Sequence, residues 1–173
     1  MSLRQLFETD KAMVSFAGWS EPDPESSVVW FNSPLSVDGV IETNLFLHGE
    51  ARADLPDQNV GLEVQFQIPG HRRRFSLARL DWLSIRGGHS NPIRTGRLLS
   101  GKRVPATHFH NFELNFNEEK GRMLKGDLPF AEEIPEQLQT FENALQTAGK
   151  LLKINKIELV KRPDWRYDLF YGR

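Results

Sequence analysis

The sequence predicts an α+β fold: a curved antiparallel β-sheet of about six strands, with one C-terminal helix packed on it. Three observations lead to this fold class. Alternation of apolar and polar residues, typical of strands, dominates the first two thirds of the chain. Only one long stretch has helical periodicity, and it comes near the end. Strands and helices do not alternate, which excludes a Rossmann-type arrangement.

Two segments in the N-terminal third begin the expected sheet. Residues 28–31 (VVWF) form a short apolar run, and the Asn-Ser-Pro that follows is expected to end the strand. Residues 40–48 (VIETNLFLH) alternate, with Ile41, Leu45 and Leu47 on one side. Because successive side chains of a strand point to opposite faces, this alternation predicts a second strand.

The clearest local signal is a hairpin. Residues 62–68 (LEVQFQI) alternate without a break, and the Pro-Gly that follows supplies the fixed φ and the positive φ of a type II turn. A short turn pairs Val64 with Phe75 and Leu62 with Leu77, so that apolar residues meet apolar residues.

The second arm of this hairpin, residues 74–85, is apolar on both faces, as is usual for a central strand. Strict alternation places Arg79 and Asp81 on the same face as Phe75 and Leu77. Charges on an apolar face must be paired or functional, because desolvation costs on the order of several kcal/mol per ion. Two interpretations stay open: a structural ion pair, or a carboxylate held by an arginine at the mouth of a site.

Residues 106–117 are predicted to form one long strand. His108 and His110 then lie on the face that Phe112, Leu114 and Phe116 define. An H-x-H pair on a strand directs two imidazoles to a common point, which is the spacing that a metal or a phosphate needs. The alternative is a pair of half-buried histidines bonded to backbone and water.

The C-terminal part of the chain contains the predicted helix. Apolar residues recur at steps of four and three from Ile134 to Ala148, with acidic residues near the start and lysines near the end. Gly149 is expected to loosen its last turn. Residues 154–160 are expected to form a last strand, and the aromatic-rich tail, residues 162–173, to dock on the body.

The composition of the chain bounds its class. Its 173 residues favour one domain, residues 1–173. The absence of cysteine excludes disulfides, thiolate metal sites and cysteine nucleophiles, and fits a reducing compartment. The N-terminus lacks the apolar core of a secretory signal, and no apolar run reaches the roughly 20 residues that span a bilayer. We therefore expect a cytoplasmic protein with no membrane partner.

A net charge of −1 hides a basic centre. Residues 71–103 contain nine Lys or Arg and one acid, a local charge of +8, so the remainder carries −9. Such a segment attracts an anionic ligand such as nucleic acid or a phosphate, whereas the simpler interpretation is a solvated surface. The candidate ligand- or cofactor-binding residues here are Arg79, Asn91, Arg94 and Arg97.

The residues best able to do chemistry lie between positions 79 and 116. The candidate catalytic residues are Asp81, His89, His108 and His110, and the three histidines are also candidate ligands of a divalent metal. Alternatively, the four groups act as general acids and bases beside a phosphate. His89 lies in the turn-rich segment GGHSNP, and loops of this kind often carry functional groups.

The segments RLDW, GGHSNP and THFHNF resemble a group of small uncharacterised bacterial proteins that share an RLD…HxNP…HxH pattern. The similarity covers residues 79–116, about a fifth of the chain. The resemblance adds weight to these positions and implies no substrate. The H-x-H pair also resembles the first cupin motif, but Glu113 follows after two residues, alternation places it on the opposite face, and no second cupin motif is present.

Three functional interpretations follow. The first is a metal-dependent or acid–base enzyme that acts on nucleic acid at the histidines and Asp81. The second is a non-catalytic nucleic-acid binder that uses Arg72–Arg74 and residues 93–103. The third is a regulatory module that binds a protein partner through an exposed sheet edge or the aromatic tail.

Overall fold

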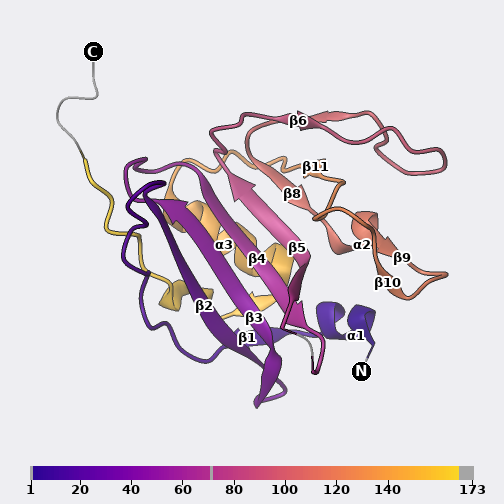
Figure 1. Ribbon diagram of the computed structural model, residues 1–173, viewed down its shortest axis with the longest axis horizontal. Coiled ribbons are helices and arrows are strands. Elements are labelled where there is room, and N and C mark those ends of the chain that lie inside the picture. The colour runs from indigo at the N-terminus through magenta and orange to yellow at the C-terminus, as the bar shows by residue number, and fades with distance from the viewer. Residues whose placement is uncertain (1, 71, 168–173) are drawn as a thin grey trace.

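A computed structural model describes residues 2–70 and 72–167. The chain forms an eight-stranded, curled and mostly antiparallel sheet with strand order β11-β8-β5-β4-β3-β2-β1-β12 (Figure 1). The predicted α+β class is confirmed. The sheet has eight strands rather than about six, and the helices are not confined to the C-terminal part, because α1 and α2 precede α3.

The elements have the following bounds. The strands of the large sheet are β1 (Lys11–Met13), β2 (Val28–Val37), β3 (Val40–Arg52), β4 (Val60–Gln67), β5 (Arg74–Trp82), β8 (His108–His110), β11 (Glu132–Glu133) and β12 (Ile154–Asn155). Two small sheets pair β6 (His89–Ser90) with β7 (Arg103–Val104), and β9 (Phe116–Asn117) with β10 (Arg122–Met123). The helices are α1 (Leu3–Glu8), α2 (Phe112–Asn115), α3 (Phe141–Leu152) and the 3₁₀-helix η1 (Ile157–Leu159).

Helix α3 covers one face of the sheet, behind β4 and β5 in Figure 1. The ring of Phe141 lies 6.5 Å from that of Trp82, which is fully buried on β5. The helix begins later than its apolar period predicts. Residues 132–133 pair with β8 instead of joining the helix, and Pro135 disfavours helical backbone at the residue before it. Thr140 is the N-cap of the helix, and its side chain accepts a hydrogen bond from the N–H of Asn143. Inside the helix, Gly149 lets Ile157 approach: a Cβ there would lie 2.8 Å from Cγ2 of Ile157.

Strand β2 continues past the expected stop at Asn-Ser-Pro. Pro34 lies within the strand, and the pairing with β3 shifts between Pro34 and Leu35. A proline is tolerated where a ladder is irregular, because the missing N–H then breaks no regular pair. The expected end of this strand is therefore wrong.

The β4–β5 hairpin is present, but its register differs from the predicted one. Val64 pairs with Ala78 and Leu62 with Leu80, whereas Leu77 has no partner in the ladder. The connection between the arms is longer than a two-residue turn, and the register shifts next to Leu77. The predicted partners, Phe75 and Leu77, are therefore wrong.

The register shift beside Leu77 changes which residues of β5 share a face. Ala78, Leu80 and Trp82 are fully buried on the face that α3 covers. Arg79 and Asp81 point to the other face, because the irregularity at Leu77 interrupts the alternation that would have aligned them with Phe75. The expectation that these two charges lie on an apolar face is wrong.

The long strand expected at 106–117 is also interrupted. Strand β8 contains only His108–His110, and Asn111 then caps helix α2 by accepting a hydrogen bond from the N–H of Glu113 at 3.1 Å. Phe112 and Phe116 consequently leave the stripe of the histidines. The expected strand at 154–160 is likewise reduced to β12, which is followed by η1.

The described part of the aromatic tail docks on the body. The ring of Trp165 is buried and meets Phe141 edge to face at 5.8 Å. Residues 168–173 of the expected docking segment lie outside the described residues. Among the helices described, none has the length and apolar character needed to cross a membrane.

Candidate metal centre

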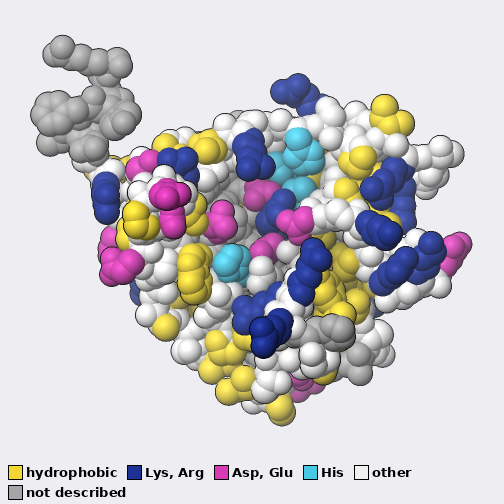
Figure 2. Space-filling view, in the orientation of Figure 1, with side chains coloured by type: hydrophobic (Ala, Val, Ile, Leu, Met, Phe, Trp, Pro, Cys, Tyr) yellow, Lys and Arg dark blue, Asp and Glu magenta, His cyan; other side chains and the backbone are white. Residues whose placement is uncertain are grey.

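The face of the sheet opposite α3 is polar, and the strand register aligns its side chains in two neighbouring rows. Partners in adjacent strands point to the same face, so each row runs across the sheet. The first row is Asn32, His48, Glu63, Arg79 and His110, and the second is Trp30, Glu50, Gly61, Asp81 and His108. Figure 2 shows this face, where acidic, basic and histidine side chains gather at the centre.

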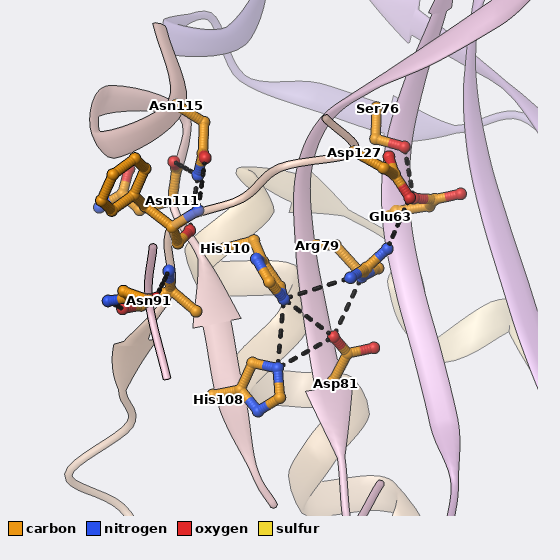
Figure 3. A network of polar contacts seen from close by, with 12 residues as sticks. Glu63, Ser76, Arg79, Asp81, Asn91, His108, His110, Asn111, Asn115 and Asp127 are labelled. Atoms are coloured by element: carbon orange, nitrogen blue, oxygen red, sulfur yellow. Dashed lines mark hydrogen bonds and ion pairs between the residues drawn. The ribbon is translucent and has the colours of Figure 1, made fainter. Parts of the chain in front are cut away.

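Three atoms at the β5–β8 end of these rows form a nearly equilateral triangle (Figure 3). Nε2 of His108 lies 3.1 Å from Nε2 of His110, and each lies 3.2 Å from Oδ2 of Asp81. Ligand atoms about 2.0–2.1 Å from a tetrahedral metal are separated by about 3.3 Å. The triangle therefore has nearly the dimensions of one face of a tetrahedral zinc site.

The tautomer of His108 follows from the hydrogen-bond partner of its Nδ1 atom. Nδ1 lies 2.8 Å from the carbonyl oxygen of Pro105, which can only accept, so Nδ1 carries the hydrogen. In the neutral ring, Nε2 then presents a lone pair to the triangle. A lone pair facing the carboxylate oxygen of Asp81 requires a proton or a cation between them. A backbone carbonyl that orients a histidine in this way is typical of metal ligands.

His89 completes the cluster from a different sheet. Its ring lies 4.8 Å from that of His108 and 5.5 Å from that of His110, and one ring nitrogen of each of the three lies within 4.8 Å of the others. Nε2 of His89 is buried and has no hydrogen-bond partner in the described chain. Burial lowers the pKa of His89, which favours the neutral ring that binds metals.

The carboxylate of Asp81 is held in its charged form. Burial alone would raise its pKa, but the polar contacts with His108 and His110 and the charge of Arg79 outweigh burial and hold the pKa well below its usual range. Arg79 donates from Nε to Oδ2 of Asp81 at 3.0 Å and from Nη1 to Asp127 at 3.1 Å. An anionic oxygen and two imidazoles thus face one point.

The cluster lies at the side of an open cleft. Asp81, His89 and His110 line a cavity of about 560 Å³, and a neighbouring cavity of about 310 Å³ extends over β4. The two cavities share Glu50, Asn59, Arg79, Asp81 and Ser84. A group bound at the triangle would therefore be accessible to a small molecule.

The structure brings together the four candidate catalytic residues and Arg79. The other proposed binding residues lie elsewhere. Asn91 is buried and bonds both backbone groups of Ala131, Arg97 donates to the carbonyl of Phe116, and Arg94 stacks over Phe130. Their predicted role in binding a ligand stays a prediction.

Sequence reasoning missed three contributors to the site. Pro105 orients His108, Asp127 pairs with Arg79, and Gly61 faces Asp81. The glycine carries no signal except its place in an alternating strand. Asp127 lies 48 residues from its partner, and only tertiary structure joins them.

Comparison of the chain with protein-family models, with curated proteins and with solved structures finds no match.

Proposed function

We propose that this protein binds one divalent transition-metal ion, of the zinc type, through His89, His108 and His110, with Asp81 as the fourth donor or as the base beside the metal. The observation that carries the proposal is the triangle of Nε2, Nε2 and Oδ2 atoms at 3.1–3.2 Å, with His108 oriented by the carbonyl of Pro105. Imidazole ligands suit zinc, nickel, copper and iron, whereas calcium and magnesium prefer sites made of oxygen ligands alone.

The position of the cluster beside the cleft favours a catalytic metal over a purely structural one. Structural zinc sites are closed by four protein ligands, whereas catalytic sites keep one position open for water or substrate. Here a metal held by the histidines faces the cavity that His89 and His110 line. When bound, the metal supplies an activated water, and Asp81 is placed to hold or accept its proton, so metal-assisted hydrolysis is the proposed reaction class.

Metal binding is tested with purified protein that has been stripped with a chelator and then titrated with Zn²⁺ and with Co²⁺. The expected result is one equivalent of metal with a dissociation constant of about 1 μM or lower, and a Co²⁺ visible spectrum of tetrahedral or five-coordinate type. His108→Ala and His110→Ala should each weaken binding by about 100-fold or more, because each removes one ligand.

The chain provides a matched control for these variants. His48 lies on the same face and in the same row as His110, but Nδ1 bonds Asn32 at 3.0 Å and the residue is outside the cluster. His48→Ala should leave metal affinity unchanged. Equal loss in His48→Ala and His108→Ala, or no stoichiometric metal in the native protein, would contradict the proposal.

A second candidate, binding of single-stranded nucleic acid, is supported by the distribution of basic residues along the cleft. At one end Arg73, Arg74 and Lys125 line a cavity of about 590 Å³, which shares Glu63 and Asp127 with the cavity of about 310 Å³ over β4. At the other end lie Arg52 and Arg86. This candidate predicts that an oligonucleotide binds in low salt and is released as salt rises. The absence of any shift in gel mobility at low salt would count against it.

A further inference from the structure

Arg79 and a metal in the proposed centre draw on the same acceptor atoms. The guanidinium lies 3.0 Å from Oδ2 of Asp81 through Nε and 3.2 Å from Nε2 of His110 through Nη2. Both acceptors belong to the triangle that would bind the metal. The third guanidinium nitrogen, Nη1, pairs with Asp127, whose side chain is largely exposed in the cleft.

Metal binding therefore changes what Arg79 can donate to. Once the lone pair of His110 is directed to a metal, Nη2 of Arg79 loses that acceptor, while Nη1 remains tied to Asp127. The side chain of Arg79 is only 24% exposed, so water replaces the lost acceptor poorly. A charged donor in such a position is satisfied by an anionic oxygen bound to the metal beside it.

The number of oxygens that an anion offers indicates which anion the site takes. Arg52, Arg79 and Arg86 line the cavity together with Glu50 and Asp81, and Arg52 and Arg79 also pair with Asp54 and Asp127. The chain therefore contributes −1 here, and a divalent ion raises the sum to +1, which favours an anion over a neutral ligand. A phosphate monoester offers three oxygens, one more than a carboxylate, for the metal, for Nη2 of Arg79 and for a further donor in the cavity.

We infer that the metal centre takes a phosphate ester, with one phosphate oxygen on the metal and another accepting from Nη2 of Arg79. This inference rests on the proposed metal function and names the substrate class of the same site. Arg79 supplies a planar, permanently charged fork, which a lysine at this position does not reproduce.

The experiment measures binding of inorganic phosphate by calorimetry to protein loaded with one equivalent of Zn²⁺ and to the chelator-stripped protein. The expected result is binding to the loaded protein that is at least about tenfold tighter than to the stripped protein, since the metal supplies the first contact. Acetate at the same concentration should bind more weakly. Equal affinity with and without zinc, or acetate binding as tightly as phosphate, would overturn the inference.

Variants separate the role of Arg79 from a structural one. Arg79→Met in the zinc-loaded protein should weaken phosphate binding by about tenfold or more, and Arg79→Lys by less, because lysine keeps the charge without the fork. Zinc stoichiometry should stay at one in both. Arg162→Met, which removes an exposed cation paired with Glu142, is the control and should leave phosphate affinity unchanged.

The outcomes distinguish the two proposals. Stoichiometric zinc without phosphate binding overturns the phosphate inference and leaves the metal centre standing, whereas failure to bind zinc overturns both. If Arg79→Met does not fold, Arg79→Lys carries the test: unchanged phosphate affinity in a folded, zinc-loaded Arg79→Lys protein would show that the fork is not used.

Discussion

Gly61 lies directly opposite Asp81 in the β4–β5 ladder, and a Cβ at position 61 would lie 3.4 Å from Oδ1 of Asp81. Oδ2 of the same carboxylate faces Arg79 and the two histidines of β8. The glycine thus keeps the second oxygen of Asp81 open to the cleft, beside the proposed metal.

Enlarging residue 61 should therefore impair the metal centre before it impairs the fold. Gly61→Val is expected to lower zinc affinity by about tenfold, because its methyl groups press on Oδ1 and turn the carboxylate. Gly61→Ala places its Cβ at an ordinary contact distance and should bind zinc as the native protein does. Calorimetric zinc titration of the two variants checks this, and equal affinities would contradict it.

Asp81→Asn is expected to lower the free energy of unfolding by about 2 kcal/mol at pH 7, because a largely buried Arg79 loses its charged partner and keeps only Asp127. Urea unfolding measures the effect. Asp54→Asn, which removes a more exposed partner of Arg52, is the control and should change the free energy of unfolding by less than about 1 kcal/mol.

The same variant makes a prediction about acid stability. The folded-state pKa of Asp81 is lowered, so its contribution to the free energy of unfolding is present above the unfolded-state pKa of about 3.9 and is lost as pH falls through the lower folded-state value. Asp81→Asn should lack this acid-dependent loss. If the free energy of unfolding fell equally with pH in the two proteins below pH 4, the lowered pKa of Asp81 would be refuted.

Asn115 links α2 to the segment at Phe130, and its loss should destabilise this part of the structure. Its buried amide donates to the carbonyls of Asn111 and Phe130, at 2.9 and 2.7 Å, and accepts from the N–H of Phe130 at 2.9 Å. Asn115→Ala should lower the free energy of unfolding by about 2–4 kcal/mol, because it leaves buried backbone groups unpaired. Asn117→Ala removes one hydrogen bond at an exposed turn and should cost less than about 1 kcal/mol. Thermal and urea unfolding of the two variants provide the comparison.

Lys11 should make stability rise with pH. Its buried ammonium donates to the carbonyls of Phe7 and Thr9 near the end of α1, and burial lowers its pKa to about 8. Between pH 8 and about 10.4 the unfolded chain keeps a proton that the folded chain has lost, so the free energy of unfolding increases by up to about 3 kcal/mol. Lys11→Met should lack this increase, whereas exposed Lys120→Met should retain it. Urea unfolding at pH 7.5 and 9.5 measures the effect. If the free energy of unfolding changed equally with pH in all three proteins, the lowered pKa of Lys11 would be refuted.

Local pattern was enough to find several elements and the chemical groups of the site. Alternation predicted the β3 and β4 strands, because a period of two depends only on neighbouring residues. The H-x-H spacing predicted that His108 and His110 converge, since residues two apart on a strand point to one side.

Local pattern failed wherever the chain departed from strict periodicity. The register shift beside Leu77 moved Arg79 and Asp81 to the polar face, and Asn111 replaced the rest of a strand with α2. Gly149 had suggested a loose helix end, but it permits the close packing of Ile157. Bulges, caps and close approaches each involve one or two residues and leave almost no periodic signal.

By itself, the sequence determined the α+β class, the apolar face of the central strands and which side chains were available for chemistry: histidines, a carboxylate and arginines, with no thiolate. Only the tertiary structure decided that Asp81 meets His108 and His110, that His89 reaches them from another sheet, and that Arg79 reaches Asp127. The reason is physical: face and periodicity are set by neighbouring residues, whereas contacts between distant strands depend on register, loop length and packing, which the whole chain determines together.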